Sequence, residues 1–114
     1  MSIVIDEGAL ENMQMLLGEQ FEDTVHFCCS EFERLESELM LNLNQDQEAA
    51  IRHAHSLKSN AAQFGAASLS DLAKTIEHAL IQGEQDIVDD SIEKLAAQVA
   101  GSKAQLQQWV SAQS

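Results

Sequence analysis

Apolar residues recur along most of the chain at intervals of three and four, the spacing that places side chains on one face of an α-helix. The clearest case is residues 19–43, where the steps alternate between four and three through Phe21, Val25, Cys28, Phe32, Leu35 and Leu39. The same spacing predicts later helices at 46–64, 69–82 and 86–111. A short helix before them is expected to be capped by Asp6 and closed by Gly18.

The apolar stripes of the predicted helices are expected to meet in one core. The stripe of the short first helix is Leu10, Met13, Leu16 and Leu17. The stripes of the last three helices are Ala50, Ala54, Leu57, Ala61 and Phe64, then Leu69, Leu72, Ala73, Ile76, Ala79 and Leu80, then Val88, Ile92, Leu95, Val99, Leu106 and Val110. Short connections predict an all-α fold, an antiparallel four-helix bundle with a short additional N-terminal helix. Because alanines let helices approach closely, the third helix is expected to pack tightly against its neighbours.

Glycines and one serine are expected to set helix ends in the middle of the chain. Gly65 is predicted to stop the third helix in a left-handed conformation, and Gly83 ends the fourth. Ser68 followed by Asp71 resembles a capping box, which would begin the fourth helix.

Composition supports helices and narrows the classes of function. Alanine, leucine, glutamine and glutamate supply 52 of the 114 residues, and valine, isoleucine and threonine only 14, which argues against a β-sandwich or barrel. The length predicts one domain, residues 1–114. The net charge of −13 disfavours binding to nucleic acid or to a membrane surface. No apolar run approaches a membrane span and no leader opens the chain, so we expect a cytoplasmic protein.

Candidate chemistry is limited to histidine. The sequence has no glycine-rich phosphate loop, nucleophile elbow or HExxH motif, which argues against an ATP-using kinase. Four histidines remain: His26, His53, His55 and His78. Residues 51–78 carry a net charge of +1, whereas residues 1–50 carry −11 and residues 79–114 carry −3. Of these three segments, only the one that contains His55 is not acidic.

On a helical wheel His55 faces away from the predicted core, whereas His53 lies at the core edge. The residues within about 60° of His55 are Glu48, Ile51, Arg52, Lys58, Ser59 and Ala62. An exposed imidazole is largely neutral at pH 7, because it titrates near roughly 6.5, and its free nitrogen is then nucleophilic. Such a ring can accept a phosphoryl group and release it. Lys58, one turn on, can offset the charge of the phosphoryl oxygens.

The run from His55 to Ala66 resembles the motif of histidine-containing phosphotransfer (HPt) domains. That motif reads H-x-L-K-G, then small residues, then a glycine ten positions after the histidine, and His55, Leu57, Lys58 and Gly65 match it in place. Ser59 stands where the family usually has glycine; serine is also a small residue, and its hydroxyl could bond the phosphoryl group. The H-x-L-K-S form occurs in stand-alone phosphotransfer proteins, including quorum-sensing relays of marine bacteria, to which the chain is similar in length and motif.

The resemblance implies a four-helix bundle with a short leading helix and a role for each motif residue. His55 would be phosphorylated on Nε2, Lys58 would stabilise the phosphoryl charge, and Gly65 would be structural. Glu77 stands where the family often has a glutamine or glutamate that orients the imidazole. An exposed or half-exposed surface charge remains an equal interpretation of Glu77.

The resemblance also implies the partners. The donor would be the aspartyl phosphate of a receiver domain in a hybrid sensor kinase, and the acceptor a receiver aspartate of a response regulator. Docking would use a patch around the histidine, for which the candidates are Ile51, Arg52, Ala62, Met13 and Leu17. The chain would be a monomeric phosphoryl carrier, a free intermediate without kinase activity and without a cofactor.

Two other functions stay open at this point. One is a helical adaptor that binds a signalling partner through an apolar face without chemistry. The other is a metal-binding bundle, suggested by the H-x-H of His53 and His55; on a helix the two rings diverge, so no metal site is expected. His26 and His78 are expected at the surface or its boundary. Cys28 and Cys29, which are adjacent and not expected to form a disulfide, are placed in the core and on a flanking face respectively.

Overall fold

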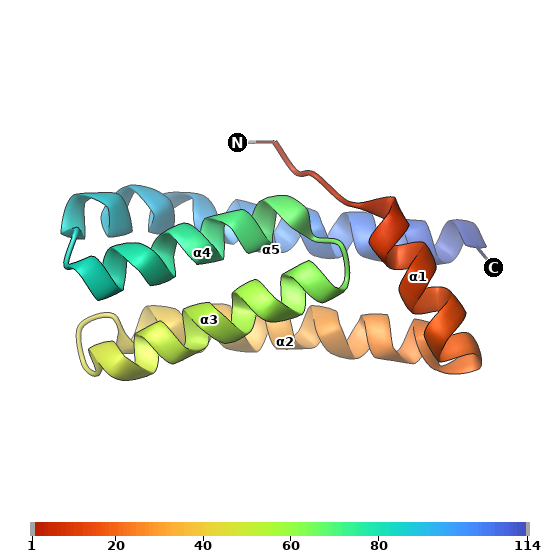
Figure 1. The fold of residues 1–114 in the computed structure, drawn as a ribbon, viewed down its shortest axis with the longest axis horizontal. Coiled ribbons are helices and arrows are strands. Elements are labelled where there is room, and N and C mark those ends of the chain that lie inside the picture. The colour runs from red at the N-terminus through yellow and green to blue at the C-terminus, as the bar shows by residue number, and fades with distance from the viewer. Residues whose placement is uncertain (1, 114) are drawn as a thin grey trace.

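The structure, a computed structural model, describes residues 2–113 and consists of helices and short connections (Figure 1). A short helix, α1 (Glu7–Leu17), is followed by a 3₁₀ turn at Gly18–Gln20. The longer helices are α2 (Phe21–Asn42), α3 (Gln47–Gln63), α4 (Ala67–Gln82) and α5 (Gln85–Gln113). No β-strand occurs over residues 2–113. The predicted all-α fold is confirmed, and the bounds of the longer helices differ from the prediction by at most two residues.

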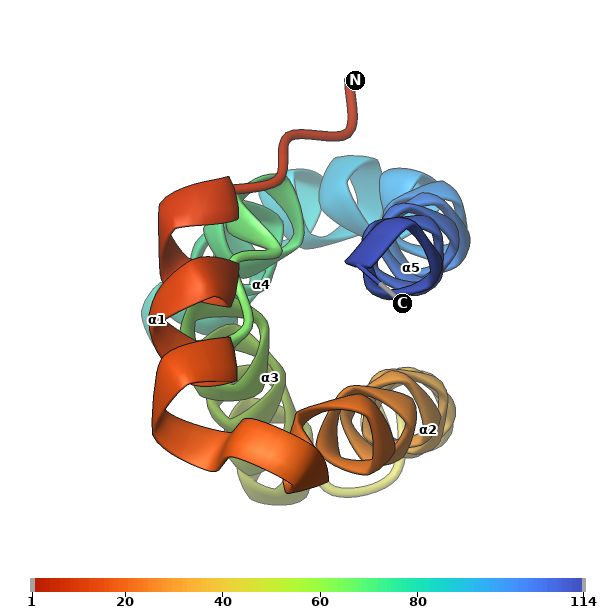
Figure 2. The same cartoon turned by 90° about the vertical axis from the view of Figure 1, so that its right-hand side faces the viewer.

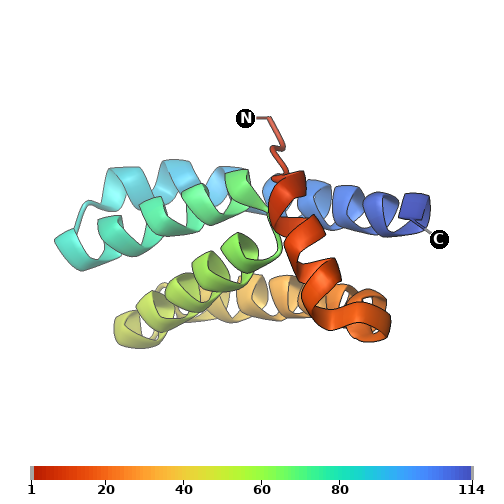
Figure 3. The ribbon, with the colours of Figure 1, turned by 45° about the vertical axis from the view of Figure 1, so that its right-hand side comes forward.

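Helices α2 to α5 form an antiparallel four-helix bundle. Each of them contacts the next along the chain, and α5 returns to contact α2, so that they enclose one core (Figure 2). α1 crosses one end of the bundle, close to the start of α2 (Figure 3). The largest fully buried side chains include Phe32, Leu35, Leu39, Leu57, Leu69, Ile76, Leu95 and Leu106, all from the predicted stripes. Within residues 2–113, none of the helices has the length and apolarity that crossing a bilayer requires.

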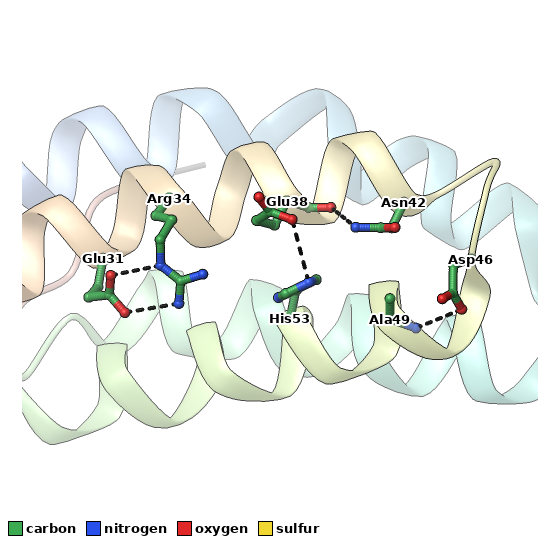
Figure 4. Close-up of polar contacts among 7 residues, drawn as sticks. All are labelled: Glu31, Arg34, Glu38, Asn42, Asp46, Ala49 and His53. Atoms are coloured by element: carbon green, nitrogen blue, oxygen red, sulfur yellow. Dashed lines mark hydrogen bonds and ion pairs between the residues drawn. The ribbon is translucent and has the colours of Figure 1, made fainter.

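α3 lies between α2 and α4, and its buried face is mostly alanine. Ala50, Ala54 and Ala61 have no exposed surface. Asp46 caps the start of α3, since its carboxylate accepts a hydrogen bond from the backbone N–H of Ala49 at 3.1 Å (Figure 4). Small side chains on the buried face allow both neighbouring helices to come close, so side chains on the flanks of α3 can reach them.

The turn between α3 and α4 depends on Gly65. Its φ of +76° is in the left-handed region that side chains rarely adopt, as the sequence predicted. A Cβ at this position would also collide with the carbonyl of Asp6, whose own N–H donates to the Gly65 carbonyl at 2.7 Å. The segment that precedes α1 therefore packs directly on this turn.

Two predictions for the outer elements are wrong. Leu16 is 77% exposed rather than part of a stripe, because α1 crosses the bundle end and turns only Leu10 fully inward. Met13 and Leu17 are half-buried. Cys29 is buried beside Cys28 rather than on a flanking face, because α5 covers that side of α2. Burial raises the pKa of both thiols.

The predicted capping box at the start of α4 is also wrong. The helix begins at Ala67, one residue before Ser68, and has no side-chain cap. The Ser68 hydroxyl lies in the core, where it donates to Oε1 of Gln98 on α5 at 2.7 Å. The serine therefore forms a hydrogen bond between two helices rather than capping the end of one.

Candidate functional site

His55 lies midway along α3 on the face opposite the alanine stripe. Its side chain is 58% exposed, whereas its neighbour Ala54 has no exposed surface. The helical wheel predicted this placement, because position along a helix fixes the face on which a side chain lies.

Glu77 of α4 brings two residues of α3 together. One carboxylate oxygen, Oε2, lies 2.7 Å from Nδ1 of His55, and the other, Oε1, accepts a hydrogen bond from Nζ of Lys58 at 2.8 Å. The Glu77 side chain is only 11% exposed. The interpretation of Glu77 as an exposed or half-exposed surface charge is therefore wrong.

The charge on Glu77 is maintained by the groups that it binds. Burial raises the pKa of the carboxyl, but hydrogen bonds from Lys58 and His55 outweigh burial and leave the pKa below its ordinary value. An ionised carboxylate can only accept hydrogen bonds, so the Nδ1 that faces Glu77 must carry the proton. Nε2 is then the imidazole nitrogen with a free lone pair, which makes it the nucleophilic atom of the ring.

Lys58 is fixed at both ends of its side chain. Its ammonium is held by Glu77, and its backbone carbonyl accepts a hydrogen bond from the Ser70 hydroxyl of α4 at 2.9 Å. The side chain is 27% exposed, so its ammonium lies at the edge of the site rather than free in water. Ser59 is exposed and follows His55 by one turn, where its small side chain leaves the imidazole accessible.

The predicted docking residues divide into two groups. Arg52 and Ala62 are exposed on the His55 face of α3, and Ile51 is half-buried there against the core. Met13 and Leu17 do not join them. They line a cavity of about 300 Å³ between α1, α2 and α3, whose other walls include Phe27, Phe64 and Gln63.

The cavity lies further along α3 than the histidine. Gln63 follows His55 by eight residues, a distance of about 12 Å at the helical rise. Phe27, on the α2 side of the cavity, is 65% exposed and was not predicted as a docking residue. The signal was present in the sequence, since Phe27 falls outside the apolar stripe of α2 although it is a large aromatic residue.

The other histidines lie apart from this site. Nε2 of His53 faces Glu38 of α2 at 3.8 Å (Figure 4), whereas Glu77 belongs to α4, the other neighbour of α3. His26 is exposed and lies 3.8 Å from Glu22 on the same helix. His78 is exposed on α4. Among residues 2–113 no three His, Cys, Asp or Glu side chains are grouped as a metal site would need.

The arrangement combines three chemical properties. It has an accessible nucleophilic nitrogen, a buried carboxylate that fixes the ring and can offset positive charge on it, and an ammonium group near the same ring. Together these suit the transient attachment of an anionic electrophile such as a phosphoryl group.

Comparison with known proteins agrees with the geometry. The Hpt domain family matches residues 10–112. The fold is similar to histidine-containing phosphotransfer protein B (HptB) from Pseudomonas aeruginosa PAO1, with a TM-score of 0.85, 22% identity and 91% of each chain covered. It is also similar to the histidine-containing phosphotransfer protein ZmHP2 from maize, with a TM-score of 0.72 and 21% identity over 93% of this chain and 86% of that one. No curated protein matches the sequence. Because the family match spans nearly the whole chain, the protein belongs to the Hpt domain family.

Proposed function

We propose that His55 is the phosphoacceptor of this chain and that Glu77 and Lys58 prepare it for transfer. Hpt domains are phosphocarriers that exchange a phosphoryl group with receiver domains, so the chain has a histidine phosphotransfer function in a phosphorelay. One observation carries the assignment to His55: the buried carboxylate of Glu77 holds Nδ1 of an exposed ring at 2.7 Å.

The chemistry requires no proton to leave the site. Nε2 of His55 attacks the phosphorus of a receiver's aspartyl phosphate. A P–N bond forms while the P–O bond to the aspartate breaks, and the aspartate departs as a carboxylate. The Nδ1 proton stays on the ring, where Glu77 offsets the positive charge that the ring acquires. In the next transfer an aspartate oxygen of a second receiver attacks the phosphorus, and Nε2 leaves with its electron pair.

Lys58 and Ser59 are assigned to the phosphoryl oxygens. The ammonium of Lys58 has three N–H donors and gives one of them to Glu77, so two remain for an anionic ligand. Ser59 lies one turn after His55, where its hydroxyl can donate to a phosphoryl oxygen. Its small size keeps the approach to Nε2 open. Gly65 is assigned a structural role only.

The receiver domain is assigned to the face that presents His55. An interface of about 800 Å² on this side corresponds to a patch with a radius of about 16 Å. Such a patch centred on His55 covers Ile51, Arg52 and Ala62 and extends to the cavity lined by Met13 and Leu17, about 12 Å along α3. Residues 51–78 have a net charge of +1 in a chain of −13, so an anionic phosphoaspartate site meets the least acidic part of the molecule.

The proposal also covers domain organisation, kinase activity, oligomeric state and cellular location. We assign residues 1–114 to a single domain, supported by the one core that α2 to α5 share. A phosphocarrier receives its phosphoryl group from a partner, so we assign no kinase activity to the chain itself. We expect one copy to act alone in the cytoplasm, between the receiver of a hybrid sensor kinase and that of a response regulator. The likeness to bacterial quorum-sensing relays remains a prediction.

Phosphotransfer from a radiolabelled receiver domain tests the proposal. Receiver domains from hybrid sensor kinases of the same genome would be charged with labelled phosphate and mixed with the wild-type chain, with His55→Gln and with the matched control His53→Gln. We expect label on the wild-type chain and on His53→Gln, and none on a folded His55→Gln. Label that persists on His55→Gln, or a wild-type chain that binds the receiver but is never labelled, contradicts the proposal; the second result favours an adaptor.

A further inference from the structure

Residues 2–6, here called the strap, run in an extended conformation from the middle of α5 to the turn before α4. The N–H of Val4 donates to the Ser68 hydroxyl at 2.9 Å, and the N–H of Ser68 donates to the Val4 carbonyl at 3.2 Å. The N–H of Asp6 donates to the Gly65 carbonyl at 2.7 Å. The strap is therefore bonded along its length, although it contains no regular secondary structure.

Two buried polar side chains hold the strap. Ser68 and Gln98 are 6% and 1% exposed, and they are hydrogen-bonded to each other at 2.7 Å. The remaining amide group of Gln98 donates to the Ser2 carbonyl at 3.1 Å. Polar groups in a helical core are costly unless they are paired, and here the pairing is completed by the strap.

Gly101 provides a seat for the strap on α5. A Cβ at this position would lie 2.5 Å from Cγ1 and 2.6 Å from Cδ1 of Ile3, so the Ile3 side chain fills the space that a larger residue would occupy. Glycine weakens the interior of a helix, and its presence within α5 has a packing explanation in this contact.

The strap continues directly into α1. Asp6 ends the strap and caps α1, since its carboxylate accepts from the N–H of Ala9 at 3.3 Å. α1 has 11 residues, too few to be stable alone, and only Leu10 of its side chains is fully buried. The C-terminal part of α1 contributes Met13 and Leu17 to the cavity beside the His55 face. The position of that cavity wall therefore depends on the strap.

We propose that Ser68, Gln98 and Gly101 are positioning residues for receiver docking: they hold the strap, the strap holds α1, and α1 forms one wall of the docking surface. This inference rests on the proposed function. Release of the strap weakens the binding of a receiver domain without changing the reactivity of His55, because the bonds that Glu77 makes to His55 and to Lys58 lie outside α1 and the strap.

A pair of substitutions that enlarges Gly101 and shortens Ile3 tests the packing of the strap on α5. Gly101→Ala displaces Ile3, because the nearest atoms to the added Cβ all belong to that side chain. Ile3→Ala in the same chain removes Cγ1 and Cδ1 and leaves Cβ at 3.7 Å, an ordinary contact. We expect Gly101→Ala to raise the receiver concentration for half-maximal transfer about two- to tenfold, the range of one lost hydrogen bond. The double variant is expected to recover most of this loss.

Ser68→Ala tests the polar anchor, with Ser102→Ala as its matched control. Ser102 is also a fully buried serine, but its hydroxyl has no hydrogen-bond partner among residues 2–113. We expect Ser68→Ala to raise the half-saturating receiver concentration as Gly101→Ala does, and Ser102→Ala to leave it unchanged. Trp109, which lines a pocket with Ile5 and Glu7, reports the strap through its fluorescence.

A chemical phosphodonor separates docking from chemistry. With phosphoramidate, Nε2 displaces ammonia from phosphorus and no receiver is involved, so the strap variants should be labelled on His55 at the wild-type rate. The inference is overturned if the strap variants change Trp109 emission but keep the wild-type dependence on receiver concentration, or if they lose phosphoramidate labelling in parallel. A wild-type chain that no receiver labels overturns the proposed function itself, and this inference with it.

Discussion

Glu77→Gln removes the charge between His55 and Lys58 and keeps the size of the side chain. The carboxylate accepts from both residues, whereas an amide has one carbonyl oxygen and can accept from only one side. Lys58 is 27% exposed and can turn its ammonium toward water, so we expect the amide carbonyl to stay on Nδ1 of His55. The ring keeps its tautomer, and Nε2 keeps its lone pair.

The expected loss in Glu77→Gln is then the difference between a charge-assisted and a neutral hydrogen bond. This difference is about 1 to 1.5 kcal/mol, which corresponds to a transfer rate about five- to fifteenfold lower. If the amide N–H₂ faced Nδ1 instead, the ring proton would move to Nε2 and the rate would fall by orders of magnitude. The size of the loss therefore reports the orientation of the amide.

Rapid-quench transfer from a saturating phosphorylated receiver measures this rate. Glu93→Gln makes the same change of charge at an exposed position of α5 and is the control. Nitrogen-15 chemical shifts of the His55 ring report the tautomer in the same variants. A wild-type rate in Glu77→Gln, or an equal loss in Glu93→Gln, would refute the role given to the buried carboxylate.

Three further predictions concern stability and reactivity. Gly65→Ala should lower the free energy of unfolding in urea by about 2 kcal/mol or more, and Gly83→Ala by about 1 kcal/mol. Both glycines have a positive φ, but only at Gly65 would an added Cβ also collide with neighbouring backbone. Equal losses would contradict this. Burial raises the pKa of the Cys28 and Cys29 thiols, so a thiol reagent at pH 8 should label the unfolded chain and spare the folded one; rapid labelling of the folded chain would contradict this. The pKa of Glu77 is lower in the folded protein than in the unfolded chain, so its charge stabilises the fold above the ordinary glutamate range, and this stabilisation is lost as pH falls through the pKa of the folded protein. The difference in unfolding free energy between wild type and Glu77→Gln should therefore shrink below about pH 4. A difference that stays constant with pH would contradict this.

Features that depend on one helix were predictable from the sequence. Helical periodicity fixes which side chains share a face, so the core stripes and the exposure of His55 followed directly from spacing. The cap at Asp6 and the left-handed glycine at Gly65 depend on a few neighbouring residues and were also predicted. The proposal that His55 is the phosphoacceptor rests on the motif around it, which is a local feature as well.

Features that depend on two helices were not predictable in the same way. Glu77 is buried because α4 lies close to α3, and Cys29 is buried because α5 covers α2; neither approach can be read from the periodicity of one segment. Ser68 lies in a cap-like sequence but is bonded across the core to Gln98, since the helix begins at Ala67, two residues earlier than expected.

The proposed docking surface could also be predicted only in part. Ile51 lies on the His55 face of α3, as the wheel predicted, because both residues belong to one helix. Met13 and Leu17 lie in a separate cavity, since the crossing of α1 over the bundle end determines their position. Phe27 lines that cavity from α2 and was missed. The surface around the histidine could therefore be predicted only with knowledge of how α1, α2 and α3 are arranged.

The central claim is that one nitrogen of His55 carries the phosphoryl group while the other is held by Glu77. Phosphorus–nitrogen coupling in the NMR spectra of the nitrogen-15 labelled chain, charged from a phosphorylated receiver, identifies the phosphorylated atom. The account predicts phosphorus on Nε2 of His55 with the proton retained on Nδ1. Phosphorus on Nδ1, or on any other residue, would contradict it.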